Sequence, residues 1–159
     1  MTTIILTIIG ILLAAAAALM VIFYGGDAFN SGTVGAQANQ IQNAGTNVIS
    51  AVQMFKAETA NAPASLADLT TAGPNGAYLD ELPALGDGQT AGLDVSTARQ
   101  YYTVSGVPAQ VCARINTNLD VTPGVAADLA DAVTAAASGP KMGCYAPDAT
   151  SPGFFVARA

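Results

Sequence analysis

Hydrophobic and polar positions divide this chain into an apolar first stretch, an amphipathic second stretch and a mixed remainder. Residues Ile4 to Tyr24 form an apolar run that only Thr7 and Gly10 interrupt. As a helix rising about 1.5 Å per residue, the run extends roughly 31 Å, which matches the hydrocarbon thickness of a lipid bilayer. The pattern therefore predicts a membrane-embedded helix over this run.

A glycine-rich segment over residues 25–35 follows the apolar run. Each glycine disfavours a helix interior by up to about 1 kcal/mol. The segment is therefore interpreted as a soft joint formed by Gly25, Gly26, Gly32 and Gly35.

Beyond the joint, apolar side chains recur at helical spacing, with amide side chains on the other faces. The apolar stripe comprises Val34, Ala38, Ile41, Val48, Val52 and Phe55. The sequence thus predicts one long N-terminal helix over residues 1–56, which is apolar over 1–24, jointed over 25–35 and amphipathic over 36–56.

A globular domain over residues 57–159 is predicted because the sequence after Lys56 changes to proline, glycine and scattered charge. A short helix is expected over residues 63–69, where Ser65 and Asp68 have the spacing of a capping box. A Gly-Pro-Asn-Gly turn is expected next, followed by an extended segment that ends at a proline. These two features occupy residues 73–76 and 78–83.

The rest of the domain combines strands and helices. Alternating aromatic and β-branched residues, or short apolar runs between turns, predict strands over residues 100–105, 141–146 and 153–159. Helical spacing of apolar residues predicts helices over residues 107–119 and 125–137. A helix followed by antiparallel strands with inserted helices is an α+β pattern.

Charge is scarce and unevenly distributed along the chain. Of the 159 residues, 52% are hydrophobic and 10% are charged, against about 25% charged in an average soluble protein. The net charge is −6, and Asp27 is the only charged side chain before Lys56. Nucleic-acid binding through a basic patch lacks the necessary cations, and the apolar content excludes a disordered acidic chain. Because the chain has no histidine, histidine-based catalysis and histidine-containing metal sites are excluded.

The apolar run lacks the flanking residues of a cleavable secretory signal. Such a signal has a basic segment before an apolar core of only about 7–15 residues, whereas no basic residue precedes Ile4 and the run is longer. The missing positive flank also leaves a membrane anchor without its usual orienting charge. Both facts are explained by the hypothesis that a basic leader has been removed and that Met1 is the mature N-terminus.

Two cysteines, Cys112 and Cys144, enclose 31 residues of the predicted domain. In an exported domain an even pair is most simply a disulfide, here between a helix and the penultimate strand. A loop of this size adds about 3–4 kcal/mol of stability in the chain-entropy description. A free or catalytic thiol is the competing interpretation, although neither cysteine has a histidine or a basic cluster beside it to activate the thiolate. A metal site made from two cysteines alone is a weaker alternative.

The order of these features resembles that of type IV pilins, in which a mature apolar helix runs directly into an amphipathic one. Two motifs add to the resemblance. Residues Ala62-Pro-Ala-Ser-Leu-Ala-Asp-Leu69 are similar to the small-residue, proline and Ser-Leu-x-x-Leu succession of pilins and pseudopilins. Residues Tyr78-Leu-Asp-Glu-Leu-Pro83 are similar to the Tyr-Leu-x-x-Leu-Pro succession that comes next in that family.

The type IVb branch, which includes the toxin-coregulated and conjugative thin-pilus pilins, is the closer likeness. Its pattern is a strand, a glycine-containing turn, a helix with the first cysteine, and a second cysteine just before the terminal strand. The segment Tyr101–Cys112, and Cys144 followed by Gly153–Val156, resemble this pattern. The start Met1-Thr2 also resembles that branch, whose mature first residue is often not phenylalanine.

The resemblance implies an α+β fold with a long N-terminal helix packed on a C-terminal antiparallel sheet, short inserted helices and one disulfide. It implies a structural subunit that polymerises through its apolar helix into an extracellular bacterial filament, after residence in the inner membrane. The filament core would comprise Ile4, Ile5, Ile8, Ile9, Gly10, Leu12, Leu13, Leu19, Val21 and Phe23. Met1 would be processed and N-methylated. The implied partners are copies of the chain itself, membrane lipid, the assembly machinery and the leader peptidase, with no cofactor, metal or nucleic acid.

One position departs from the pilin pattern. Most pilins have a glutamate at mature position 5, where it neutralises a neighbour's N-terminal amine, but this chain has Ile5. The first acidic residue, Asp27, lies about 33 Å further along a helix. An unpaired buried ammonium is costly, so docking would use backbone carbonyls, the hydroxyls of Thr2 or Thr3, or a deprotonated amine.

Other classes of function fit parts of the sequence. The runner-up is a secretion pseudopilin or minor pilin, or a single-pass membrane-anchored periplasmic binding module. Some pseudopilins bind calcium in a loop, but the two carboxylates of residues 87–94 are too few for a shell of about 6–8 oxygens. An ordinary Gly-rich loop is therefore expected there. An enzyme is the least favoured class, because no nucleophile–base pair, phosphate loop or convergent acidic pair is recognisable.

Overall fold

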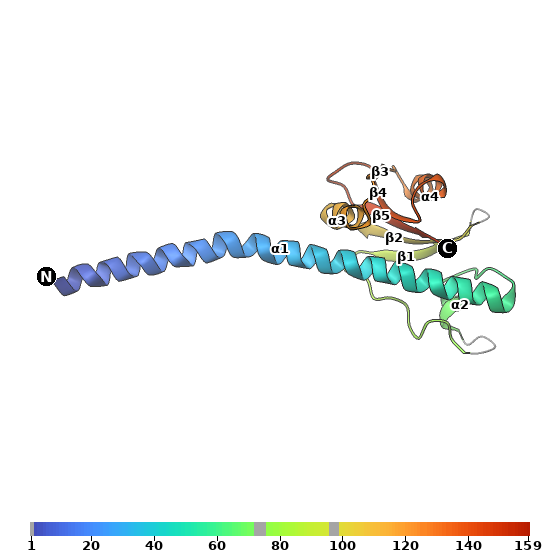
Figure 1. The fold of residues 1–159 in the computed structure, drawn as a ribbon, viewed down its shortest axis with the longest axis horizontal. Coiled ribbons are helices and arrows are strands. Elements are labelled where there is room, and N and C mark those ends of the chain that lie inside the picture. The colour runs from blue at the N-terminus through green and yellow to red at the C-terminus, as the bar shows by residue number, and fades with distance from the viewer. Residues whose placement is uncertain (1, 72–75, 96–98) are drawn as a thin grey trace. The chain divides into compact units, whose positions relative to one another are not determined.

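The computed structural model describes residues 2–71, 76–95 and 99–159, and the side chains of residue 2 and of residues 23–28 lie outside this description. The elements along the chain (Figure 1) are α1 (Thr2–Thr59), α2 (Ala67–Thr70), β1 (Thr90–Asp94), β2 (Tyr101–Val107), α3 (Ala109–Leu119), β3 (Gly124–Val125), α4 (Leu129–Ser138), β4 (Met142–Ala146) and β5 (Gly153–Arg158). The expected α+β class, with a long first helix, is confirmed.

The chain divides into two compact units, Met1–Gly35 and Ala36–Ala159, and α1 contributes residues to both. The first unit contains the apolar part of α1, in which the Thr7 hydroxyl donates to the carbonyl of Thr3 over 2.8 Å. This bond satisfies a polar side chain within the apolar run. Helix α1 is assigned without interruption through the expected joint over residues 25–35, so the glycines do not end the helix.

The second unit is built on a five-stranded sheet with the order β1-β2-β5-β4-β3. Among the described strands, β1–β2, β2–β5 and β5–β4 pair antiparallel, as expected, whereas β3 and β4 pair parallel. The parallel pair arises because α4 connects β3 to β4, and a crossover through a helix returns the chain in the same direction.

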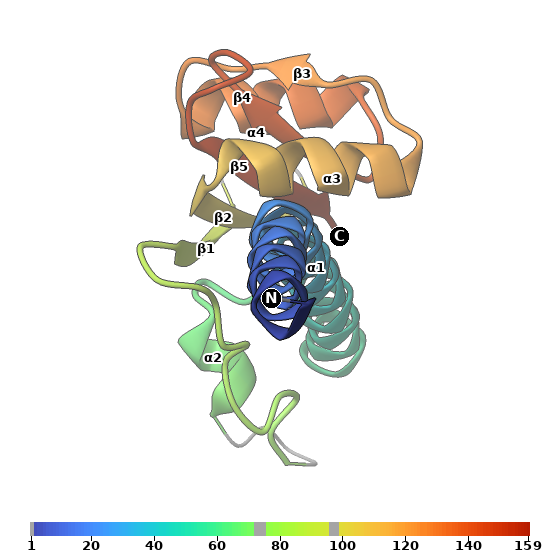
Figure 2. The same cartoon turned by 90° about the vertical axis from the view of Figure 1, so that its left-hand side faces the viewer.

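Helices cover both faces of this sheet. The face that includes Tyr102, Cys144 and Phe155 packs against α1 and α3, which lie side by side (Figure 2). The opposite face packs against α4, with Tyr101, Tyr145 and Val156 in one buried cluster with apolar residues of that helix. Because successive side chains of a strand point to opposite faces, each central strand contributes to both cores.

The amphipathic part of α1 behaves as its pattern predicts. Ala38, Ile41, Val48 and Val52 are buried in the second unit, and Phe55 is half-buried. Ala44 and Ala51 are also buried. This part of α1 is therefore a core element of the same compact unit as residues 57–159.

Two expectations in the second unit are wrong in part. The second half of the expected Gly-rich loop over 87–94 is strand β1, which lies at the edge of the sheet beside β2. Val125 does not begin a helix, because it pairs with β4 as part of β3. Helix α4 begins later, after Asp128, whose carboxylate accepts the backbone N–H of Asp131 over 2.9 Å and caps the helix.

The short helix α2 contains half of the expected capping box. The Asp68 carboxylate accepts the backbone N–H groups of Ala64 and Ser65, over 2.8 and 2.9 Å. The bonds run from the second residue of α2 back to the backbone that precedes the helix, as the acidic residue of a capping box does. The extended segment expected over 78–83 contains bends, and the expected turn over 73–76 lies almost entirely outside the described residues.

Candidate assembly site

The apolar part of α1 is exposed in the single chain. The structure places the predicted filament-core side chains on its surface, with exposed fractions from 48% at Ile9 to 72% at Val21. The exposed members are Ile4, Ile5, Ile8, Ile9, Leu12, Leu13, Leu19 and Val21. The segment Thr3–Ile22 is long and apolar enough to cross a membrane, a property that signal sequences share. A contiguous apolar surface of this kind marks a site that lipid or protein covers.

Some predicted positions fall outside this description. Met1 is not among the described residues, and neither the side chain of Phe23 nor the surroundings of Gly25 and Gly26 are described. Gly10, Gly32 and Gly35 are described, and nothing lies within 4 Å of the place that a Cβ would occupy at any of them. Their open surroundings leave room for a second chain to approach the helix backbone.

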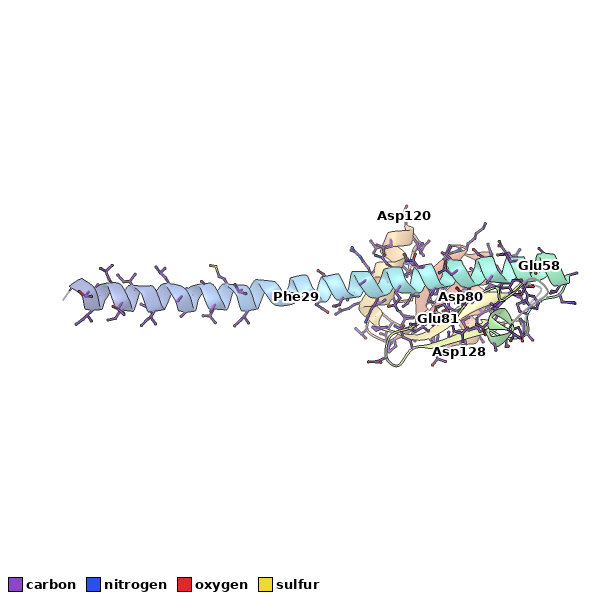
Figure 3. All side chains as sticks on the ribbon, turned by 90° about the horizontal axis from the view of Figure 1, so that it is seen from below. Phe29, Glu58, Asp80, Glu81, Asp120 and Asp128 are labelled. Carbon is purple, nitrogen blue, oxygen red and sulfur yellow. A yellow bond between two sulfur atoms is a disulfide. The ribbon has the colours of Figure 1, made fainter. Side chains whose placement is uncertain are left out.

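Phe29 extends the apolar surface and was not among the predicted site residues. Its side chain is 80% exposed, at the place on α1 that Figure 3 labels. The sequence could have indicated Phe29, because it lies outside the apolar stripe of the helix and a large aromatic side chain there cannot be buried in the domain core.

The second unit holds its part of α1 tightly. A Cβ added to Gly45 would lie 2.8 Å from Cε1 of Phe155, so the helix and strand β5 are in direct backbone-to-ring contact. Gln42 Nε2 donates to the carbonyl of Ile115 on α3 over 3.3 Å, and Gln40 Nε2 donates to the carbonyl of Ala84 over 2.7 Å. The helix is therefore fixed by a core on one side and by side-chain hydrogen bonds at its flanks.

The segment after α2 is also fastened to α1. The Tyr78 hydroxyl donates to Oε2 of Glu58 over 2.7 Å, and its ring packs edge-on against Phe55 at a centroid distance of 5.3 Å. The hydrogen bond to Glu58 raises the pKa of the exposed Tyr78 hydroxyl.

The predicted disulfide between Cys112 and Cys144 is confirmed, and it joins α3 to β4. The thiol and two-cysteine metal alternatives are therefore wrong for the described structure. Asn116, one turn after Cys112, is buried, and its amide makes two hydrogen bonds with the backbone of Cys144. Asn116 was not among the predicted site residues. The indication in the sequence was that Asn116, a polar residue, follows Ile115 on the apolar side of the predicted helix.

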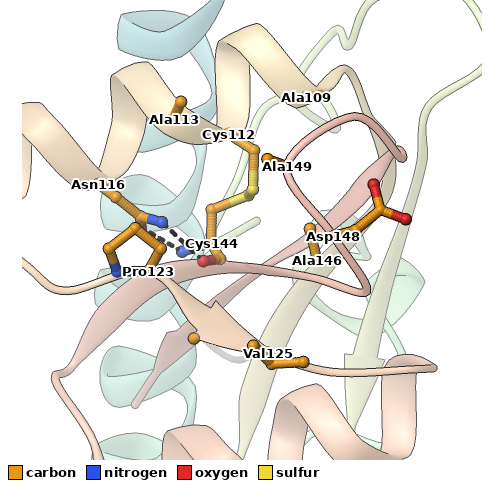
Figure 4. A pocket seen from close by; sticks show the side chains of 11 residues that line it. Ala109, Cys112, Ala113, Asn116, Pro123, Val125, Cys144, Ala146, Asp148 and Ala149 are labelled. Atoms are coloured by element: carbon orange, nitrogen blue, oxygen red, sulfur yellow. Dashed lines mark hydrogen bonds between the residues drawn. A yellow bond between two sulfur atoms is a disulfide. The ribbon is translucent and has the colours of Figure 1, made fainter.

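A pocket of about 220 Å³ opens beside the disulfide (Figure 4). Its walls come from α3, β3 and β4, and Asp148 lies at its side. The Asp148 carboxylate accepts hydrogen bonds from the hydroxyls and backbone N–H groups of Thr150 and Ser151. These bonds, the one from the Thr150 hydroxyl foremost, hold the pKa of Asp148 well below its usual range. A carboxylate stabilised in its ionised form by its own loop is a poor general base.

Two arginines bind the carboxyl end of α4. Nη1 of Arg158 donates to the carbonyls of Ala136 and Ala137, and Nη1 of Arg99 also donates to that of Ala137. Guanidinium groups at this end of a helix satisfy carbonyls without intrahelical partners and interact favourably with the helix dipole. These two cations therefore have a structural role.

Among the described residues, no group of three or more His, Cys, Asp or Glu side chains is placed to hold a metal ion. Comparisons with protein families, curated proteins and solved structures return no match for this chain.

Proposed function

We propose that this chain is a pilin of the type IVb kind, a structural subunit that polymerises through the apolar part of α1 into an extracellular filament. The observation that carries the proposal is the division of one helix between two environments. Residues 3–22 are apolar and exposed, whereas residues 38–52 of the same helix bury one face in the core of a disulfide-bonded domain. Because the apolar segment and the buried segment belong to one helix, lipid or other copies that bind the apolar segment also hold the domain.

In the proposed assembly route, lipid of a bacterial inner membrane covers the apolar helix first, and the helices of neighbouring copies cover it in the filament. Moving an apolar helix from lipid into protein gains little from the hydrophobic effect, so close packing must supply the stability. Gly10 and the alanines of residues 14–18 are small enough to allow helices to approach closely. The partners would be the assembly machinery and a leader peptidase that exposes Met1 for methylation.

The N-terminal amine needs a partner other than the usual glutamate, since position 5 is isoleucine. The Thr3 carbonyl already accepts the Thr7 hydroxyl. In the proposed filament, the hydroxyls of Thr2 and Thr3 are candidates to accept a hydrogen bond from a neighbour's amine, and loss of the amine's proton is the alternative.

The proposal is tested on cells that make the chain together with its assembly proteins. Material sheared from the cell surface is sedimented, imaged by electron microscopy and analysed by mass spectrometry of the N-terminal peptide. Filaments composed mainly of this chain, starting at a methylated Met1, are expected. Membrane-bound monomers alone under these conditions would reject the pilin proposal, and short fibres confined to the periplasm would favour a pseudopilin instead.

A matched pair of variants separates the helix from the domain surface. Leu12→Gln and Val125→Gln both replace an exposed apolar side chain with an amide, at exposed fractions of 63% and 79%. Leu12→Gln is expected to lower filament yield because the amide would be buried without a defined partner. Val125→Gln is expected to leave the yield unchanged, and equal yields from both variants would contradict assembly through the helix.

A further inference from the structure

Within the second unit, residues 36–55 of α1 have an exposed face without charge. Residues 28–55 contain no Asp, Glu, Lys or Arg. Asn39, Asn43 and Asn47 are exposed and follow one another at intervals of four residues, so they lie in one line along the helix. We call these three asparagines, with the neighbouring Pro83 and Ala84, the amide groove.

Neither helix propensity nor contact with water accounts for this composition. Asparagine is among the weaker helix formers, about 0.7 kcal/mol less favourable than alanine at an interior position. A helix face that only meets solvent usually carries Lys and Glu, which favour both the helix and hydration. Amides differ from these residues in presenting donors and acceptors together without a charge.

The groove retains unused hydrogen-bonding capacity. Asn39 accepts from Asn118 Nδ2 over 3.4 Å, and Gln40 donates to the Ala84 carbonyl. The side chains of Asn43 and Asn47 make no hydrogen bond within the described part of the chain. They line a shallow groove of about 440 Å³, whose other wall is Pro83 and Ala84.

The distribution of charge on the second unit favours an uncharged partner surface for this groove. Each copy has a net charge of −6, and exposed acidic side chains lie outside the groove on the second unit (Figure 3), at Glu58, Asp80, Glu81, Asp120 and Asp128. Of these, Glu81 is two residues before the groove residue Pro83 in the chain. Two copies that approach through such surfaces bring like charges together. The side chains that line the groove carry no charge, so a second copy can bind there without desolvating an ion of the groove.

We infer that the amide groove receives an uncharged stretch of α1 from a second copy of this chain. An amide is both donor and acceptor, so the asparagines can bond to the Asn, Gln, Ser and Thr side chains of residues 28–55 of that copy. The inference rests on the proposed function, since it names the contact by which copies pack beyond the apolar segment.

Photocross-linking of the full-length chain in cells tests the contact directly. A benzophenone amino acid replaces Asn43 in one variant and Thr134 in a control, because Thr134 is exposed on α4 at the opposite face of the sheet. Irradiation is expected to yield a covalent homodimer from position 43, with the attached peptide from residues 28–55, and none from position 134. No homodimer from position 43, or attachment only to another protein or segment, would overturn the inference.

Charge substitutions provide a second readout. In a chain with Asn47 replaced by the benzophenone amino acid, Asn43→Lys is expected to lower the yield of homodimer about tenfold, because an unpaired ammonium would be buried in the contact. Asn43→Gln is expected to preserve the yield, as is Thr134→Lys. Thermal unfolding and an intact disulfide check that each variant is folded. Equal yields from Asn43→Lys and Thr134→Lys would reject the groove.

The two proposals fail in different ways. A homodimer from position 43 in cells that form no filament would retain the groove and reject the pilin proposal. Filaments without a cross-link from position 43 would retain the pilin proposal and reject the groove.

Discussion

The side-chain amide of Asn116 makes the two backbone hydrogen bonds with Cys144 that a neighbouring strand would otherwise make. Asn116 Nδ2 donates to the carbonyl of Cys144, and the Cys144 N–H donates to Asn116 Oδ1, both over 2.8 Å. Strand β3 is too short to make these bonds, because it pairs only with Tyr145 and Ala146. Cys112, one helical turn before Asn116, is bonded covalently to the same residue. Helix α3 is thus fastened to β4 twice at one position.

Replacing Asn116 with alanine is expected to destabilise the second unit by about 2–4 kcal/mol, because it leaves a buried donor and a buried acceptor of Cys144 without partners. The free energy of unfolding is measured by urea denaturation of the full chain in a mild detergent. Asn118→Ala is the control, since Asn118 is exposed and makes one long hydrogen bond; its effect is expected to stay within about 0.5 kcal/mol. Equal effects of the two substitutions would show that the bonds to Cys144 do not contribute to stability.

Reduction of the Cys112–Cys144 disulfide is expected to lower the free energy of unfolding by about 3–4 kcal/mol, since the 31 enclosed residues gain freedom in the unfolded chain. The measurement compares urea unfolding of the full chain with and without a reductant. The Cys112→Ser, Cys144→Ser double variant should unfold at the same midpoint with and without reductant. An unchanged midpoint for the reduced parent protein would contradict the expectation.

Alanine is expected to act oppositely at two glycines of α1. Gly45→Ala places a Cβ 2.8 Å from the ring of the buried Phe155, and such overpacking destabilises by about 1–3 kcal/mol. Gly35→Ala meets nothing within 4 Å and gains up to about 1 kcal/mol of helix propensity. Circular dichroism during thermal unfolding measures both. If Gly35→Ala keeps its helix content yet lowers filament yield, residues 25–35 must bend during assembly, as the joint prediction requires.

Stability is expected to fall at alkaline pH because of Tyr102. Burial raises the pKa of its hydroxyl to about 12, so the folded chain retains a proton that the unfolded chain loses near pH 10. The folded state therefore loses stability as the pH rises from about 10 to about 12. Urea midpoints across this range measure the slope, which Tyr102→Phe is expected to reduce. The raised pKa of Tyr78 adds a contribution of the same sign, which Tyr78→Phe would remove separately.

Local signals were sufficient for much of this fold. The buried stripe of α1 follows from the spacing of Ala38, Ile41, Val48 and Val52, and the disulfide follows from an even cysteine count in a domain expected to be exported. These features depend on periodicity and pairing, which are present in the sequence itself.

The missed features depend on neighbours that are distant in sequence. Strand β1 reads Thr-Ala-Gly-Leu-Asp, with little β-propensity, and it is extended because β2 offers an unpaired edge. Gly124 and Val125 form β3 for the same reason, beside β4. Asn116 acquires its role only when Cys144, 28 residues later, is brought next to it. No local pattern around these residues indicates the partner that determines their conformation.

The sheet order β1-β2-β5-β4-β3 places β5, which follows the other described strands along the chain, between β2 and β4. Without Gly153–Arg158, the described strands would form two separate pairs, β1 with β2 and β3 with β4. Isolated two-stranded units are marginally stable in water. The compactness of the second unit therefore depends on one strand that joins two otherwise unconnected halves of the sheet.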